Sequence, residues 1–259
     1  MVKCIQLKKG DFFMDKVKTI EEGIARLYVE ADMPAKPFKY IPRGESAYCD
    51  AVEIDGKVIP LYDWRYYVKN SGLYCNCDSY LGKLSTLRTS HFAGRDKTLK
   101  QLLFIELDLA EYFLRSKVAY IMGMGNEKAA NFIVKMENDT ICSLELAVTM
   151  PAGERSRAKH TIYSTNGQSS DLCFDNKLDQ DEIFVFADGG NQSFIDIDIP
   201  LFGLTPKQMD ITYTIFGLLR DLDDHDEWIS RESYLLNLVD GAFKSLETGT
   251  KTVYKELRV

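Results

Sequence analysis

The sequence predicts an α+β fold in which one open, mainly antiparallel sheet carries helices on a single face. Segments 131–137 and 140–150 have the pattern of strands, and Asn138-Asp139 between them is a two-residue hairpin signal that makes them antiparallel. Helical patterns lie at the two ends of the chain instead of alternating with strands. No glycine-rich strand-to-helix turn typical of dinucleotide binding is recognised, because turn signals follow Gly123-Met124-Gly125, the nearest candidate.

The first part of the chain, residues 1–96, is predicted to hold one helix and one hairpin. A strand at 2–7 precedes a helix at 19–33, opened by Thr19 with Glu22 at capping-box spacing. The apolar stripe of this helix comprises Ile20, Ile24, Leu27, Tyr28 and Ala31. Asp55-Gly56 predicts a tight turn between strands at 47–54 and 57–62. The stretch 64–96 has no clear period and is interpreted as a long, ligand-facing loop.

The second part, residues 97–259, has a sharper pattern. A helix is predicted at 97–116, with a face made of Leu99, Leu102, Leu103, Glu106, Ala110 and Phe113. The predicted strands are 118–124, 131–137, 140–150, 159–164, 182–187 and 251–258. Thr205-Pro206 opens a helix that runs to about 222, and Ser230 opens a last helix that Gly249 ends. Whether residues 1–96 form a separate domain or extend the same one is left open.

Composition excludes several classes of function. Lys and Arg total 32 and Asp and Glu total 39, so the formal net charge is −7, which argues against a nucleic-acid partner. No apolar run reaches the roughly 20 residues that span a bilayer, and no signal-peptide pattern is recognised. Six cysteines without such a signal are typical of reduced thiols, so we expect a cytoplasmic protein.

Four stretches of sequence, taken in order, carry a resemblance to a known family. They are 106–114 (ELDLAEYFL), 131–139 (NFIVKMEND) with 144–146 (LEL), 160–167 (HTIYSTNG) and 242–249 (AFKSLETG). Together they make about the last 160 residues resemble the C-terminal domain of the Gfo/Idh/MocA oxidoreductases, the family of glucose–fructose oxidoreductase and inositol dehydrogenase. The resemblance implies an open sheet that makes subunit contacts, with the opposite face and its helices closing over a carbohydrate-like substrate.

The same resemblance tests the family's chemistry. Its helix carries an Asp, a His four residues later and an Asp three residues after that. The last Asp matches Asp108, so the His position falls on Ile105 and the first Asp on Gln101. Isoleucine cannot accept the proton that a sugar hydroxyl loses during hydride transfer. The family's Glu-Lys-Pro motif has only a superficial echo in Ala35-Lys36-Pro37.

The family's Rossmann domain, which holds NAD(P), is not recognised in the first 95 residues. We therefore expect no bound cofactor and no metal, and a protein that is not a self-sufficient NAD(P)-dependent dehydrogenase.

Two carboxylates of the helix at 97–116 are candidate site residues. Glu106 lies on the apolar face, where an unpaired carboxylate is costly. It is either a ligand-binding or acid/base group with a raised pKa, or a member of a buried salt bridge, or it reaches solvent on a slightly rotated helix. Asp108 is a candidate substrate-binding residue through the family match, or serves packing and hydrogen bonding.

The segment 88–97 (RTSHFAGRDK) supplies the other candidates, Arg88, His91, Arg95 and Lys97. Cations, an imidazole and hydroxyls would suit a polyol, a sugar acid or a phosphate, although a plain solvated loop has the same composition. Four tyrosines close in sequence could stack on a sugar: Tyr66, Tyr67, Tyr74 and Tyr80.

The remaining polar residues are interpreted as structural. His160 begins a strand, and His225 is expected to titrate in an exposed acidic loop. Cys75 and Cys77 lack the further ligands that a zinc site needs, so we expect unligated thiols.

The leading hypothesis is a non-catalytic relative of these oxidoreductases that binds a sugar-like or polyol molecule, or serves as an accessory or oligomerisation subunit. Its partner would be a second copy through the sheet, or a subunit containing a Rossmann domain. The alternative is a cofactor-independent isomerase, lyase or glycoside-cleaving enzyme for sugars or sugar acids, with Glu106 and His91 as candidate catalytic residues. A purely structural dimerisation module is the third possibility, and a concave polar pocket would argue against it.

Overall fold

The computed structural model describes residues 9–44, 46–79, 81–171, 182–187, 190–195 and 204–254, with side chains at 18–44, 46–67, 69–75, 81–171 and 204–254. The chain divides into two compact units, residues 1–67 with 197–229, and residues 68–196 with 230–259. This division differs from the expected boundary at residue 96, since 68–96 joins the second unit and 197–229 joins the first. None of the described helices is both long and apolar enough to cross a bilayer.

The first unit combines helices with a small sheet. Its elements are α1 (Lys9–Glu30), β1 (Lys39–Ile41), β2 (Ala51–Ile54), β3 (Lys57–Pro60), the 3-10 helix η1 (Asp63–Arg65) and α5 (Pro206–Leu219). The strands form an antiparallel sheet in the order β1-β2-β3. The turn between β2 and β3 is Asp55-Gly56, and both residues have positive φ, as a two-residue hairpin turn requires. This predicted hairpin is confirmed.

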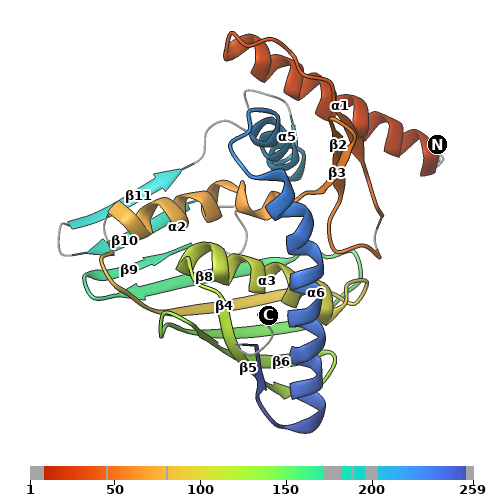
Figure 1. Cartoon of the computed structure of the whole chain (residues 1–259). Helices are drawn as coiled ribbons and strands as arrows, with labels where there is room; N and C mark the ends of the chain where they lie inside the picture. Colours follow the sequence, from red (N-terminus) through yellow and green to blue (C-terminus); the bar gives the residue numbers. More distant parts are fainter. Residues whose placement is uncertain are drawn as a thin grey trace, which may run out of the picture. The chain divides into compact units, whose positions relative to one another are not determined.

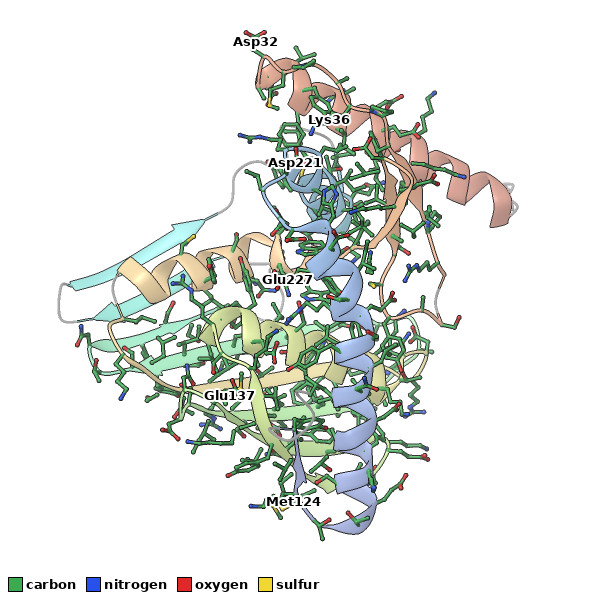
Figure 2. The ribbon with its side chains drawn as sticks, viewed as in Figure 1. Asp32, Lys36, Met124, Glu137, Asp221 and Glu227 are labelled. Carbon is green, nitrogen blue, oxygen red and sulfur yellow. The ribbon has the colours of Figure 1, made fainter. Side chains whose placement is uncertain are left out.

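Helix α1 begins well before the residue that was expected to open it. Thr19 lies inside the helix, so the capping-box interpretation of Thr19 and Glu22 is wrong. The stripe Ile20, Ile24, Leu27 and Tyr28 is buried as predicted, but Ala31 is exposed beyond the helix end. The Tyr28 ring packs edge-on against Phe216 of α5 with ring centroids 5.3 Å apart. On the surface of the unit, Lys36 Nζ donates to Asp221 Oδ2 at 2.7 Å (Figure 2).

The second unit is built on a large sheet. Its elements are α2 (Val68–Ser79), β4 (Leu84–Gly94), α3 (Leu99–Leu114), β5 (Val118–Gly125), β6 (Ala129–Met136), β7 (Ile141–Met150), β8 (Arg157–Ser164), β9 (Gly167–Ser170), β10 (Glu182–Ala187), β11 (Gly190–Ile195) and β12 (Thr252–Val253). Helix α6 (His225–Thr248) contributes its residues from Ser230 onward. The described strands run in the order β11-β10-β9-β8-β4-β7-β6-β5-β12. Among these pairs only β4 and β7 are parallel, so the sheet is mainly antiparallel, as predicted.

One face of this sheet is buried under helices and the other is open. Along β6 the side chains alternate, with Phe132 and Val134 buried and Ile133 half-buried on the opposite face. Figure 1 shows α2 and α3 on the same face of the sheet, and α3 contacts β4 and β7. The amide of Gly123 in β5 donates to Ser245 Oγ of α6 at 3.0 Å, which attaches α6 to this face. The expected α+β class with helices on a single face is confirmed.

The segment 64–96 contradicts the prediction of a long loop. It contains the end of η1, helix α2 and β4, an eleven-residue strand at the centre of the sheet. In β4 the buried positions include Thr89 and His91, so polar residues hide the period of two that normally reveals a strand. The hydrophobic pattern of the sequence could not show that these polar side chains are buried.

Other element boundaries differ by a few residues. Thr205 and Thr98 cap α5 and α3. Helix α5 begins where its sequence indicated, whereas α3 begins at Leu99 instead of 97. Helix α6 begins at His225 instead of Ser230, because Asp224 Oδ1 accepts hydrogen bonds from the amides of Asp226 and Glu227. The expected strand at 2–7 and residues 255–258 of the one at 251–258 lie outside the described residues, whereas the described part of the latter contains β12.

Candidate functional site

The central feature of the second unit is a contact between β4 and α3. His91 Nδ1 lies 2.7 Å from Glu106 Oε1, and the two side chains are 8% and 1% exposed. Strand β4 directs His91 toward the helix-covered face, and α3 directs Glu106 back toward the sheet. The structure thus brings together two residues that the sequence nominated separately.

A second histidine extends this pair into a buried network. His160 Nε2 of β8 lies 3.0 Å from Glu106 Oε2, and its Nδ1 lies 3.1 Å from Asp171 Oδ2. The backbone amide of His160 also donates to Asp171 Oδ1. The Phe113 ring packs edge-on against the His160 imidazole, with centroids 5.6 Å apart. Four polar groups are therefore linked in the order His91, Glu106, His160, Asp171.

Electrostatics in this network are set by burial and by opposite charges. Burial lowers the pKa of His160, but the carboxylates of Glu106 and Asp171 outweigh it and raise the pKa to about 10. Burial likewise raises the pKa of Glu106, but His160, followed by His91, brings it down to about 2. His160 is therefore an imidazolium at neutral pH and Glu106 is ionised. Of the three alternatives left open for Glu106, the buried salt bridge describes it, and its pKa is lowered instead of raised.

The His91 imidazole is the group of this network that could take part in acid/base chemistry. Ionised Glu106 only accepts hydrogen bonds, so the Nδ1 atom of His91 must carry a proton. The Nε2 atom of His91 makes no hydrogen bond to the described residues. Within the same region, Thr89 Oγ1 is buried with no hydrogen-bond partner in the described part of the chain. A carboxylate that orients an imidazole in this way resembles the base of many acid/base sites.

Asp108 belongs to a different cluster on α3. Its carboxylate accepts a hydrogen bond from Arg231 Nε of α6, and Arg231 Nη1 donates to Glu111 Oε2 at 3.0 Å. Lys117 Nζ lies 2.9 Å from the same oxygen of Glu111, and Tyr234 also donates to this carboxylate. Asp108 is fully buried. This cluster joins α6 to α3, so Asp108 does not face the same region as Glu106.

Arg95 and Lys97 lie together at a cavity of about 630 Å³. It lies where the loop before α3, the turn between β5 and β6, the end of β7 and helix α6 meet. Its charged and aromatic lining consists of Arg95, Lys97, Lys100, Lys128, Glu127 and Phe243. Arg88, in contrast, is exposed on β4 at a position of opposite parity to His91, so the structure places it on the open face.

Several other expected roles differ from the structure. Tyr74 stacks on Tyr112 with centroids 4.3 Å apart, and Tyr66 donates to Asp223 at 2.5 Å within the first unit. Tyr80 and the side chain of Cys77 lie outside the described residues, whereas Cys75 is exposed. His225 is not in an exposed loop, because it begins α6 with Nε2 3.0 Å from the carbonyl of Leu218. No group of His, Cys, Asp or Glu within the described ranges is arranged to hold a metal ion.

The sequence did not indicate that His160 belongs to the network. It also did not indicate roles for Asp171 and Arg231, or for the cavity lysines Lys100 and Lys128. His160 lies opposite Thr89 in the pairing of β8 with β4, which places it beside His91 on the same face. A strand pairing across 70 residues leaves no local signal in the sequence. The only available signal was Glu106 itself, a carboxylate on an apolar helix face that needs a cationic partner.

Comparison with known proteins gives a fold. No protein-family model and no curated protein matches the sequence. An oxidoreductase from Agrobacterium radiobacter, in complex with NAD+, L-tartaric acid and magnesium, matches with a TM-score of 0.61 and 14% identity over 74% of this chain and 63% of that chain. An oxidoreductase domain protein from Kribbella flavida matches with a TM-score of 0.61 and 10% identity, over 75% and 66%. Levoglucosan dehydrogenase, in complex with NADH and levoglucosan, matches with a TM-score of 0.61 and 10% identity over 75% of this chain and 65% of that chain.

These likenesses show that the chain shares its fold with proteins described as oxidoreductases, levoglucosan dehydrogenase among them. The chain spans less than two thirds of the length of the three solved structures named above. A match over 74% of 259 residues is longer than the segment 97–259 alone. The likeness therefore extends beyond the segment that carried the resemblance in sequence.

Proposed function

We propose that this chain is a relative of the Gfo/Idh/MocA oxidoreductases that binds a carbohydrate-like molecule without transferring hydride by itself. One observation carries the proposal. In the family pattern, Ile105 occupies the position of the proton-transferring His, and Asp108, which does match, is fully buried and hydrogen-bonded to Arg231. A side chain without a titratable group cannot accept a hydroxyl proton, and a carboxylate bound to a guanidinium is a poor base.

Calorimetric titration of the protein with NAD(H) and NADP(H), and then with neutral and acidic sugars, tests this function. We expect heat of binding with at least one sugar and none at micromolar concentrations with either nucleotide. Clear micromolar binding of a nicotinamide nucleotide by this chain would contradict the proposal. A failure of every sugar to bind would remove its carbohydrate part.

The cavity at Arg95 supports ligand binding over a purely structural role. A sheet used only for assembly needs no concave polar site on its helix side. The partner in this proposal is a second copy of the chain, or a subunit containing a Rossmann domain, bound through the open face of the sheet. Met122, Met124 and Ile141 on the strands of that face are exposed apolar side chains that such a partner would cover.

A second candidate function has its own observation. The 2.7 Å contact between His91 Nδ1 and Glu106 leaves Nε2 of His91 as a base, which fits a cofactor-independent isomerase or lyase acting on sugars or sugar acids. In this case His91→Gln should abolish turnover of the substrate while the melting temperature changes little. A His91→Gln protein with full activity would exclude this role. Glu106→Gln is less informative, because it also removes the partner of His160.

A further inference from the structure

The cavity beside α3 combines a cationic rim with an apolar floor. Its volume of about 630 Å³ falls in the range of small-molecule sites in proteins. Leu99 and Val148 form buried parts of the lining, and the Phe243 ring contributes an aromatic wall from α6. The polar groups around them are mostly positive.

The charge of this lining differs from that of the chain as a whole. Arg95 and Lys128 have no carboxylate partner among the described residues, and the nearest carboxylate oxygen of Asp96 is 3.9 Å from Lys97 Nζ. Lys100 is paired with Asp240 at 2.9 Å, and Glu127 is the acidic residue of the lining. A protein with a formal charge of −7 thus concentrates cations at one cavity. Such a local excess attracts anions.

The backbone holds the cationic residues in place. The amide of Arg95 donates to the carbonyl of Met150 at 3.1 Å, and Asp96 Oδ1 accepts from the amide of Gly153 at 3.0 Å. On the other side, Val148 donates its amide to the carbonyl of Lys128 at 2.8 Å. Both segments are therefore fixed to the end of β7 before any ligand arrives, which reduces the entropy that binding must overcome.

We propose that this cavity binds the anionic end of a carbohydrate, a carboxylate or a phosphate, with the sugar ring against Phe243. The proposal rests on the carbohydrate binding proposed above and specifies its chemical class. Arg95, Lys97 and Lys128 supply charge-assisted hydrogen bonds to the anion. The apolar faces of a pyranose ring pack well against an aromatic side chain, so Phe243 distinguishes a sugar anion from a bare one.

Calorimetric titration with D-glucuronate, glucose 6-phosphate, inorganic phosphate and D-glucose tests the class of ligand, and the first two separate a carboxylate from a phosphate. We expect at least one sugar anion to bind about tenfold more tightly than D-glucose at low salt, with the preference shrinking as salt rises. Lys97→Gln and Lys128→Gln should each weaken binding several-fold. Lys159→Gln, an exposed lysine of β8 outside the cavity, is the matched control.

Phe243→Leu provides the second measurement. This variant should lower the affinity for the sugar anion several-fold and leave the affinity for inorganic phosphate unchanged. The inference is overturned if D-glucose binds as tightly as both sugar anions, if neither anion binds, or if the cavity variants bind like the control. Binding of D-glucose with no preference for anions would overturn it while leaving the proposed function intact. Absence of binding by all three sugars would overturn this inference, and only a failure of every other sugar as well would remove the carbohydrate part of the proposed function.

Discussion

Asp108 on α3 accepts a hydrogen bond from Nε of Arg231 on α6, and the two residues are 123 positions apart in sequence. Both side chains are buried, so the guanidinium compensates a carboxylate that has lost its water. Glu111 shares the same guanidinium. One arginine thus connects two acidic residues of α3 to α6.

Replacing this arginine should therefore be costly. Arg231→Met removes the guanidinium that pairs with the buried carboxylate of Asp108, and we expect the free energy of unfolding to fall by about 3–5 kcal/mol. Urea denaturation followed by circular dichroism measures it. Adding Asp108→Asn should restore part of the loss, because the buried negative charge that faced the guanidinium disappears. Arg95→Met, on an exposed arginine, is the control and should change stability by about 0.5 kcal/mol at most; an equal loss in both variants would contradict this account.

The buried imidazolium of His160 predicts a pH dependence of stability. Its pKa of about 10 in the folded state lies above the ordinary value of 6.5, so the folded protein keeps a proton that the unfolded chain releases. The resulting stabilisation is complete below about pH 6.5 and is lost as pH rises toward 10. Between these values the free energy of unfolding should fall by as much as about 1.4 kcal/mol per pH unit.

Urea denaturation of the protein and of His160→Gln at several pH values tests this dependence. The variant should be less stable at pH 6 and should lack the decline above pH 6.5. Parallel profiles for the two proteins would show that His160 does not bind the extra proton.

Replacing Gly241 of α6 with alanine should lower the stability of the protein, whereas the same change inside a helix normally raises it. A Cβ at this position would overlap the hydroxyl of Tyr254 and lie 2.9 Å from its Cζ. Tyr254 donates to the carbonyl of Leu238 at 2.9 Å, and its own amide donates to Ala119 at 2.9 Å. Alanine normally stabilises a helix by about 1 kcal/mol relative to glycine, but Gly241→Ala should destabilise by about 1–3 kcal/mol. In a Tyr254→Leu background the loss should shrink, and thermal denaturation of the four proteins measures the difference.

The open face of the sheet predicts self-association. Met122 and Met124 are exposed on β5, and Figure 2 shows Met124 at the far end of that strand. Light scattering coupled to gel filtration should give a mass above the 29.6 kDa of one chain, and Met122→Lys with Met124→Lys should reduce it to one chain. Val29→Lys, on an exposed valine of α1, should leave the mass unchanged. If the wild-type protein has the mass of a single chain, self-association is excluded, and the only proposed partner left is a subunit containing a Rossmann domain.

The fold was predictable where local rules decide it. Turns such as Asp55-Gly56 and caps such as Thr205 depend on a few neighbouring residues, and the structure has them where the sequence indicated. Strand β4 was missed because its buried face carries Thr89 and His91 instead of aliphatic residues. The grouping of 197–229 with the start of the chain depends on contacts between distant segments, which no local pattern reports.

The site was predictable in part for the same reason. Glu106 stood out because a carboxylate on an apolar helix face requires a partner, and His91 was nominated separately, as part of the segment 88–97. His160 reaches Glu106 only because β8 pairs with β4 in a particular register. Once two imidazoles face one carboxylate, its pKa falls instead of rising, which no reading of the helix alone could have given.

The position of β4 at the centre of the sheet has a consequence for biosynthesis. Its neighbours β7 and β8 follow much later in the chain, as the bonds from Ser90 to Glu145 and from Ser85 to Tyr163 illustrate, with separations of 55 and 78 residues. A nascent polypeptide that ends just after β4 cannot form this sheet, because β7 and β8, the two strands that pair with β4, have not yet been synthesised. We expect polar residues along that strand, among them Arg88 and Ser90, to reduce aggregation through its unpaired backbone edges during this interval.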